Sequence, residues 1–312
     1  MRILLTGAEI TEERLHQLRE IAPQAEFAHF SSNKAMEDEI SEADIVAGRV
    51  SEQALAKASK LKWIHTWSAG PDAQLFPAFL QHPAVLTCSK GSGAVPLAER
   101  VILLMLTLTH DLRRSLAAQN AKRWEPFFHT ELTGLTIGII GAGNSGLDLA
   151  QKAKSFHMRV LGIRRSDVPT PHFDKMYARE ELHAFLAECD FVVVTAPRTP
   201  ETTGMLGAPE FAAMKPTAYY FCISRGGIAD DDALLSALKQ GTIAGAGLDA
   251  HGVEPLPPES PFWELPNVII TAHNGATTSQ NRERRFQYFL KNLENYLAGR
   301  PFFNVVDKNA GY

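Results

Sequence analysis

Short runs of apolar residues recur along the chain and alternate with longer segments whose apolar positions follow a helical period. In the first hundred residues, the short runs lie at 3–5, 45–47, 61–66 and 85–87. Such runs are typical of strands that are buried on both faces, and strands that alternate with helices form parallel sheets covered by helices. The pattern therefore predicts an α/β unit at the N-terminal end.

A second series of apolar runs fills the middle of the chain. Its six members lie at 137–140, 159–163, 191–195, 218–223, 246–250 and 268–271. Helices are expected between them, among them 180–188 and 231–240, the latter ended by Gly241. Strands and helices in this order predict a second, larger doubly wound sheet. A last helix at 279–298 follows the final strand and is expected to return the chain to the first unit.

Between the two series, residues 94–116 predict one long helix. Pro96 suits its first turn, and Val101, Leu104 and Leu108 share one face. A helix this apolar between two α/β halves is expected to lie between domains and to contact a second copy of the chain. The sequence thus predicts a homodimer.

Glycines follow the first strand of the second series directly, at Gly141, Gly143 and Gly146. The first permits a tight turn, the second lets the backbone approach phosphates, and the third lets helix and strand pack closely. The helix that begins here turns its N–H groups and positive dipole end toward an anion. Together with Asn144 and Ser145, these glycines predict a site for the pyrophosphate of a dinucleotide. The alternative is a turn with a structural role alone.

These observations predict an α/β fold with two doubly wound parallel-sheet domains. Residues 96–279 form the predicted Rossmann domain, which binds the dinucleotide. Residues 1–95 and 280–312 form a smaller, discontinuous, flavodoxin-like domain, to which we assign substrate binding.

The end of the second Rossmann strand distinguishes the two nicotinamide dinucleotides. A carboxylate there accepts hydrogen bonds from the ribose 2′-OH of NAD, whereas an arginine accommodates the 2′-phosphate of NADP. This chain has Arg164, Arg165 and Ser166 at this point and no acid. Because guanidinium groups bind phosphate in a bidentate manner, NADP(H) is predicted in preference to NAD(H). The alternative is that the arginines are solvated and discriminate little.

Titratable residues follow three of the later strands: Arg225, Glu254 and His273. Parallel strands end at one edge of their sheet, so these side chains are expected to converge beside the glycine loop. Each alone has a plainer interpretation, as a surface cation, a loop carboxylate and a structural histidine. In the first domain, the N–H groups of Ala69 and Gly70 at a strand end are expected to hold a carboxylate, unless this loop is only a connecting turn.

Four motifs occur in a fixed order: GAGNSG at 141–146, SRGGIADDDAL at 224–234, GLDAHGVEPLPPESPFW at 247–263 and NVIITAH at 267–273. In this order and spacing, the chain resembles the D-isomer-specific 2-hydroxyacid dehydrogenases. The resemblance implies an oxidoreductase that reduces a small 2-oxo acid to the D-2-hydroxy acid by hydride transfer. Glyoxylate, hydroxypyruvate and larger 2-oxo acids all stay open as substrates.

The resemblance also implies roles for single residues. Arg225 would bind the substrate carboxylate, helped by main-chain donors of the first-domain loop. His273 would be the general acid in reduction and the base in oxidation, which suits an imidazole because its unperturbed pKa is about 6.5. Glu254 would hold the His273 ring, and Asp249 would contact the nicotinamide carboxamide.

The chain departs from the family pattern at four positions near this site. His251 stands where an aromatic residue is usual, and Gly252 where an acid is common. Cys222 replaces asparagine, and Ser145 replaces isoleucine in the glycine loop. His251 adds a second histidine, which either contacts a ligand or is a loop residue. None of these changes removes a predicted catalytic residue.

Composition narrows the classes of partner. Of the 312 residues, 45% are hydrophobic and 21% charged, and the net charge is −4 with dispersed basic residues. Neither nucleic acid nor a membrane surface is therefore expected as a partner. The three scattered cysteines fit neither a disulfide framework nor a metal site. With no leader or membrane span expected, the protein is predicted to be cytoplasmic and to hold no metal.

Two other functions stay open at this point. One is a dinucleotide-sensing binding protein of the corepressor type, which the complete set of Arg225, Glu254 and His273 disfavours. The other is a dehydrogenase of a phosphorylated 2-hydroxy acid, which would need a second phosphate clamp that the sequence does not make evident.

Overall fold

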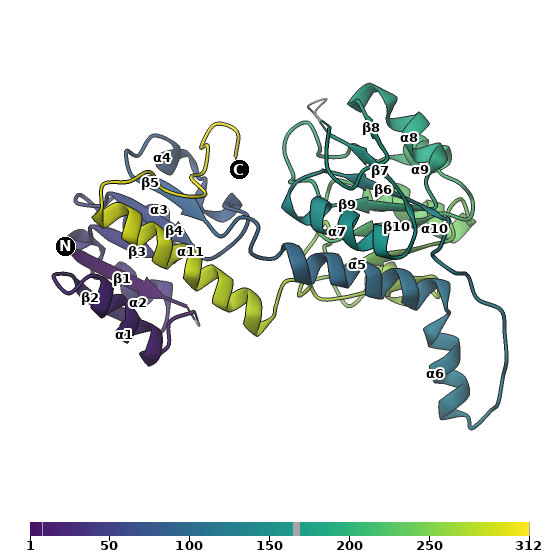
Figure 1. Cartoon of the computed structure of the whole chain (residues 1–312), viewed down its shortest axis with the longest axis horizontal. Helices are drawn as coiled ribbons and strands as arrows, with labels where there is room; N and C mark the ends of the chain where they lie inside the picture. Colours follow the sequence, from purple (N-terminus) through teal and green to yellow (C-terminus); the bar gives the residue numbers. More distant parts are fainter. Residues whose placement is uncertain (8, 165–168, 312) are drawn as a thin grey trace. The chain divides into compact units, whose positions relative to one another are not determined.

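The computed structural model describes residues 1–7, 9–164 and 169–311. The chain divides into two compact units, drawn with their elements in Figure 1. The smaller unit is Met1–Gly93 with Thr277–Tyr312, and the larger unit is Ala94–Ala276. The boundaries between the units therefore lie after residues 93 and 276, whereas the sequence analysis predicted them after residues 95 and 279.

The smaller unit is built on a five-stranded parallel sheet with the order β2-β1-β3-β4-β5. Its strands are β1 Arg2–Thr6, β2 Glu26–Phe30, β3 Ile45–Ala47, β4 Trp63–Thr66 and β5 Val85–Cys88. This is the flavodoxin-like order, so the predicted fold class of the unit is confirmed. The sequence prediction missed β2, because Glu26 and His29 of this edge strand are exposed, its other residues are only half-buried, and it has no long apolar run.

Helices and 3₁₀ turns complete the smaller unit: α1 Glu12–Ile21, α2 Asn33–Glu37, η1 Ile40–Glu42, α3 Glu52–Leu55, η2 Asp72–Gln74, α4 Pro77–Leu80 and α11 Ser279–Leu297. The last helix packs its buried residues Phe286, Phe289 and Leu293 into the same core as Trp63 of β4. The rings of Trp63 and Phe289 stack with centroids 5.3 Å apart. The C-terminal helix is therefore an integral part of this unit.

The larger unit has a seven-stranded parallel sheet with the order β12-β11-β10-β9-β6-β7-β8. The strands are β6 Thr136–Ile140, β7 Arg159–Ile163, β8 Lys175–Tyr177, β9 Phe191–Val194, β10 Tyr219–Cys222, β11 Gly245–Leu248 and β12 Val268–Ile270. The order reverses at β6 as in a Rossmann sheet, which confirms the doubly wound prediction. Only β8 was not predicted, because it is three residues long, at the sheet edge, and begins with an exposed lysine.

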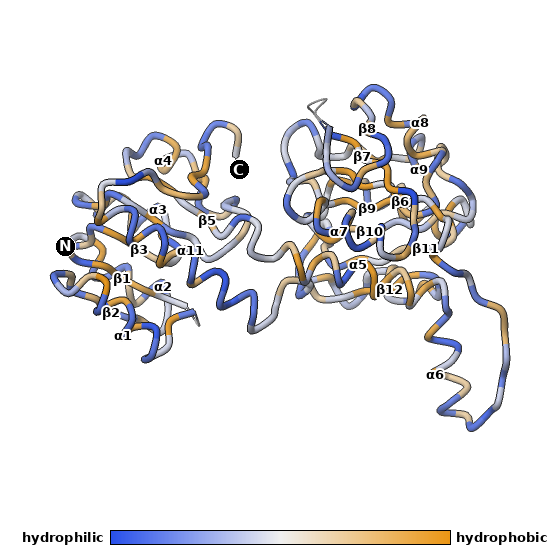
Figure 2. The backbone as a smooth tube through the Cα atoms, viewed as in Figure 1, coloured by the Kyte–Doolittle hydropathy of each residue, from blue (hydrophilic) through white to orange (hydrophobic). Residues whose placement is uncertain are grey.

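The central strands of this sheet are buried on both faces, which explains their apolar runs. Every residue of β6 and β9 is buried. Figure 2 shows the apolar segments concentrated in the strands and in the helix faces that cover them. The covering elements are α5 Ala94–Thr109, α7 Asn144–Ser155, η3 Arg179–Glu181, α8 Leu182–Glu188, α9 Ala208–Ala213, α10 Asp231–Gln240 and η4 Pro261–Glu264.

The prediction of one helix over 94–116 was wrong. The chain leaves α5 at Thr109 and begins a new helix, α6 Leu112–Asn120. Asp111 causes the break, because it adopts a left-handed conformation with φ of 43° and its carboxylate caps α6 by accepting from the Arg114 N–H. Figure 1 shows α6 and the irregular segment after it extending from the body of the larger unit.

Candidate active site

The glycine loop after β6 is shaped by close backbone contacts. Gly141 has a φ of +105°, and a Cβ there would lie 2.7 Å from the main-chain nitrogen of Ala196. A Cβ at Gly146 would lie 2.2 Å from the Gly141 carbonyl oxygen. Neither position accepts a larger residue without a shift of backbone, so both glycines are required by packing.

Gly143 differs, because a Cβ there would meet nothing within 4 Å. It is the N-cap of α7 and offers no side-chain cap to the N–H groups that follow, at Asn144 and Ser145. The hydroxyl of Thr195 donates to the Gly141 carbonyl at 2.5 Å and fixes the loop to the end of β9. The helix N-terminus thus fits a pyrophosphate, with open space at the glycine that a phosphate would approach.

The side chain that follows β7 is a cation. Arg164 is half-buried, and its Nη1 donates to the hydroxyl of Thr170 at 3.2 Å. Arg165 and Ser166, the other residues predicted to bind the cofactor here, lie outside the described residues. The site at the end of the second Rossmann strand therefore presents a guanidinium group, which suits an anion rather than a ribose hydroxyl.

Glu254 and His273 are brought together from two loops at the carboxyl edge of the sheet. Nδ1 of His273 lies 2.8 Å from Oε2 of Glu254, and the two side chains are 39% and 36% exposed. Because the carboxylate engages Nδ1, the other ring nitrogen, Nε2, is the one left to exchange a proton with a substrate. An imidazole held in this way is suited to general acid–base catalysis.

The Glu254 carboxylate is held in its ionised form. Burial raises its pKa, but the hydrogen bond from the His251 N–H and the interaction with His273 lower it more, and the net pKa lies below the usual value. The His251 N–H donates to Oε1 at 2.9 Å, so each carboxylate oxygen has its own partner. The carboxylate is therefore held in a fixed direction beside the His273 ring.

Arg225 lies on the loop after the neighbouring strand β10. This loop meets the end of β11, because the N–H of Asp249 donates to the Cys222 carbonyl at 2.9 Å. Nη1 of Arg225 donates to the Ser224 carbonyl at 2.8 Å, and the Cys222 thiol donates to the Arg225 carbonyl at 3.3 Å. The guanidinium is half-buried at the same sheet edge as Glu254 and His273.

Asp249 makes hydrogen bonds that hold the His273 turn, a role that was not predicted from the sequence. Its carboxylate is fully buried and accepts from the Thr271 hydroxyl at 2.5 Å and from the N–H groups of Asn274 and Gly275 at 3.2 and 2.9 Å. These bonds hold the turn in which His273 adopts a left-handed φ of 46°. Asp249 therefore fixes the turn that presents His273. A hydroxyl residue two positions before His273 was the available sequence signal.

The substrate loop predicted in the smaller unit follows β4. Ala69 is exposed and Gly70 half-buried, and neither N–H has an acceptor among the residues that the structure describes. The loop is fixed at its start by two hydrogen bonds. The Trp67 indole donates to the Thr6 carbonyl at 2.7 Å, and the Ser89 N–H donates to the Ser68 carbonyl at 3.0 Å. Its geometry suits main-chain donors for an anion.

The cysteines are free and buried in both units. Burial raises the pKa of Cys189 to about 12 and that of Cys222 to about 11, so both stay protonated thiols near neutral pH. Within the described ranges, no three side chains of the metal-binding types lie close enough to share an ion. In the same ranges, no helix is both long and apolar enough to cross a membrane.

Comparisons with known proteins agree on one family. The family model of the D-isomer specific 2-hydroxyacid dehydrogenase NAD binding domain matches residues 102–275. The chain is 35% identical over 268 residues to glyoxylate/hydroxypyruvate reductase B of Pectobacterium carotovorum, with 83% of each protein covered.

Two solved structures are similar over nearly their whole length. A D-isomer specific 2-hydroxyacid dehydrogenase family protein from Aeromonas salmonicida superposes with a TM-score of 0.90, at 31% identity, covering 98% of this chain and 99% of that one. An NADPH-dependent glyoxylate/hydroxypyruvate reductase from Sinorhizobium meliloti, in complex with NADP and sulfate, has a TM-score of 0.86 at 29% identity, covering 100% and 99%.

Proposed function

Because the chain belongs to the D-isomer specific 2-hydroxyacid dehydrogenase family, whose members are oxidoreductases that use nicotinamide dinucleotides, we propose that it reduces a small 2-oxo acid to the D-2-hydroxy acid. The observation that carries the proposal is the Glu254–His273 pair, joined at 2.8 Å on the sheet edge that also carries the glycine loop. Glyoxylate and hydroxypyruvate are the first substrates to test, because a relative at 35% identity is named for them.

His273 and Glu254 are assigned to the proton transfer. The dihydronicotinamide, when bound, supplies the hydride that reaches the carbonyl carbon. His273 gives the proton from Nε2 to the carbonyl oxygen, so that the C=O bond becomes a C–OH group, and the ring then regains a proton from solvent. Glu254 stabilises the charged ring before transfer. In the oxidation direction, the same nitrogen removes the hydroxyl proton.

The substrate carboxylate needs cationic and N–H donors. We assign it to Arg225, whose planar guanidinium can bind a carboxylate in a bidentate manner, and to the main-chain N–H groups of Ala69 and Gly70. Asp249 is assigned to the nicotinamide carboxamide in addition to its structural bonds.

NADPH is the proposed donor of choice. The support is Arg164 at the end of β7, where a carboxylate for the ribose 2′-OH of NAD is absent from residues 162–164. A similar solved reductase contains NADP. Measured kcat/KM values for NADPH and NADH test this directly, and a clear preference for NADH would refute it.

A homodimer is proposed as well, with a surface different from the one first inferred. Val101, Leu104 and Met105 are buried in the core of the larger unit and are not available to a partner. Several exposed apolar side chains lie on α6 and the segment after it, where Trp124 is 98% and Phe128 104% exposed. Light scattering at micromolar concentration tests the proposal, and a monomer for the wild type would contradict it.

We place the enzyme in the cytoplasm, where its buried free thiols would stay reduced.

One panel of assays separates the candidate functions. The wild type is tested with glyoxylate, hydroxypyruvate, longer 2-oxo acids and phosphorylated 2-oxo acids, each with NADPH and NADH, while cofactor binding is measured by titration. We expect turnover of the unphosphorylated acids. Turnover of phosphorylated acids alone would favour the alternative dehydrogenase, and tight cofactor binding without any turnover would favour a dinucleotide-sensing protein.

A further inference from the structure

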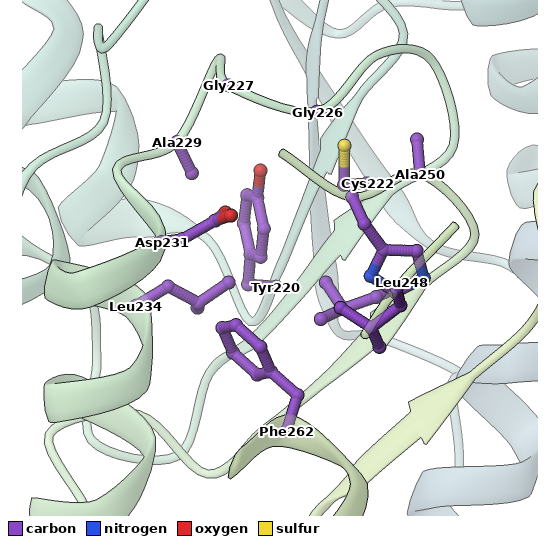
Figure 3. Close-up of a pocket in the computed structure, with 12 residues that line it drawn as sticks. Tyr220, Cys222, Gly226, Gly227, Ala229, Asp231, Leu234, Leu248, Ala250 and Phe262 are labelled. Atoms are coloured by element: carbon purple, nitrogen blue, oxygen red, sulfur yellow. The ribbon is translucent and has the colours of Figure 1, made fainter. Parts of the chain in front are cut away.

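Two of the departures from the family pattern, Cys222 and His251, line one small cavity in the larger unit. The cavity has a volume of about 20 Å³ and is enclosed by the loop after β10, the loop after β11 and the first turn of α10. Its polar lining consists of Tyr220, Cys222, Asp231 and His251 (Figure 3). A cavity of this size has room for about one water molecule, and a polar lining is what holds such a water.

The Tyr220 hydroxyl supports this interpretation. It is buried beside the Cys222 thiol and has no hydrogen-bond partner of normal geometry among the described residues. Figure 3 shows this hydroxyl and the Asp231 carboxylate pointing toward the same space. Buried hydroxyls are almost always hydrogen-bonded, and one water in this cavity would give the Tyr220 hydroxyl a partner.

The His251 ring joins two strand ends. It is 9% exposed, and its Nε2 donates to the Thr271 carbonyl at 3.3 Å. Thr271 lies two residues before His273 and bonds Asp249 through its hydroxyl. The ring therefore fastens the loop after β11 to the segment that carries His273.

The main chain of His251 is also linked to His273, through Glu254. Its N–H donates to Oε1 of Glu254 at 2.9 Å, and Oε2 of Glu254 lies 2.8 Å from Nδ1 of His273. A displacement of His251 would thus change the direction in which Glu254 holds the imidazole.

Glycines keep His251 in place on the side of the substrate-binding arginine. A Cβ at Gly226, the residue after Arg225, would lie 1.9 Å from the His251 carbonyl oxygen. A Cβ at Gly252 would lie 2.2 Å from Oδ2 of Asp231, which explains the absence of the acid that is common there. The two loops therefore interlock, and the backbone of His251 is a fixed point between Arg225 and Glu254.

We propose that His251 is a positioning residue: its ring, held by the Thr271 carbonyl and a water in the polar cavity, fixes the N–H that orients Glu254 and, through Glu254, the imidazole of His273. An aromatic residue without ring N–H groups would fill the same volume but would bind neither the carbonyl nor the water. The role in catalysis rests on the proposed function, whereas the effect on the His273 ring does not.

The titratable groups around this loop are few. Glu254 bonds the His273 ring, Asp249 is engaged by Thr271, Asn274 and Gly275, and Asp231 faces the cavity. Tyr220 and Cys222 are neutral, because burial raises the pKa of both. A change in the titration of His273 that follows a substitution at His251 can therefore be traced through Glu254.

The test compares His251→Phe with His251→Gln, which keeps an N–H donor. Titration of the His273 ring is followed by NMR of protein labelled at histidine Cε1, with the resonance assigned through His273→Ala. We expect the Phe variant to lower the titration midpoint of His273 by about 0.5 pH unit, because a misdirected carboxylate stabilises the charged ring less. The Gln variant should lie close to wild type. Val253→Ala, in the same loop but 63% exposed, is the matched control and should shift nothing.

A double-mutant cycle separates positioning from packing. In a Glu254→Ala background, His251→Phe should leave the His273 midpoint unchanged, since the residue that passes on the effect is missing. An equal shift in both backgrounds, or no shift in either, would overturn the proposal. Melting temperatures identify any variant that fails to fold, and His251→Leu, which also lacks a ring N–H donor, then replaces the Phe variant with the same expected shift.

Activity provides the second readout. With a 2-oxo acid that the wild type reduces, His251→Phe should lower kcat about five- to tenfold and leave KM within twofold, because the acid and not the substrate clamp is disturbed. A rise in KM at constant kcat would contradict this. If the wild type reduces no 2-oxo acid, the proposed function fails, while the NMR cycle still decides whether His251 positions His273.

Discussion

The two units place different kinds of groups at the carboxyl edges of their sheets. In the larger unit, the strand ends carry charged side chains, and a buried carboxylate, Asp249, fixes the turn that presents His273. In the smaller unit, the corresponding edge carries a loop whose chemical groups are main-chain N–H donors, fixed by the indole of Trp67. We infer that the first arrangement takes part in the reaction, whereas the second binds and selects the substrate.

The difference assigns separate kinetic roles to the two units. Substitutions at the edge of the larger unit should lower kcat or change the cofactor preference, because they remove the groups to which we assign proton transfer and cofactor binding. Substitutions in the smaller unit should change substrate affinity or the stability of that unit alone. Each of the following experiments can break this division.

The largest effect is expected for His273→Ala. Loss of a positioned acid should lower kcat by about two to four orders of magnitude with small effects on dinucleotide binding. His183→Ala is a matched control, because His183 also pairs with a glutamate, Glu210, at 2.9 Å but lies on α8. Steady-state kinetics with the best 2-oxo acid measures both. Equal rates for wild type and His273→Ala would show that another residue supplies the proton.

The next effect concerns the cofactor. Arg164→Ala should lower the ratio of kcat/KM for NADPH to that for NADH by about ten- to a hundredfold, the range for a hydrogen bond to a charged group. Arg159→Ala is the control, because Arg159 begins the same strand and pairs with Glu188 at its opposite end. An unchanged ratio for Arg164→Ala would remove this arginine from the cofactor site.

These residues also show how far the sequence could be read. The glycine loop and the strand-end residues were predictable, because each buried parallel strand is a short apolar run and the glycines or titratable residues follow soon after it in the sequence. The break at Asp111 was not, because helical periodicity continues across it and only a left-handed φ reveals it. The edge strands β2 and β8 were missed because half-exposed strands lack an apolar run. The structural bonds of Asp249 depend on main-chain donors, which every sequence contains.

The smaller unit offers a test of stability with pH. His65 is fully buried, and burial lowers its pKa to about 3, against about 6.5 in an unfolded chain. Between these values the unfolded state binds a proton that the folded state does not, so this unit should lose about 1.4 kcal/mol of stability for each unit of pH below 6.5. The neutral, buried His65 therefore contributes its full stabilisation above pH 6.5, and this contribution is lost progressively as the pH falls toward 3.

Chemical unfolding followed by tryptophan fluorescence measures this effect, because Trp63 and Trp67 are buried in the smaller unit while Trp124 and Trp263 of the larger unit are exposed. His65→Gln should flatten the pH dependence, and His16→Gln, at an exposed site, should leave it as in the wild type. A wild-type stability that is constant from pH 6.5 to 5 would contradict the assignment.

The smallest effect is expected for Trp67→Phe, and it bears most directly on the division of roles. The substitution keeps an aromatic ring against Phe289 but removes the hydrogen bond to the Thr6 carbonyl, which loosens the start of the proposed substrate loop. Loss of one such bond is worth about 1 kcal/mol, so KM for the 2-oxo acid should rise about fivefold while kcat stays within twofold. Trp263→Phe removes a comparable indole bond, to the Pro257 carbonyl in the larger unit, and should change neither constant. If Trp67→Phe instead lowered kcat at constant KM, the smaller unit would take part in the chemical step, and the two edges could no longer be assigned separate roles.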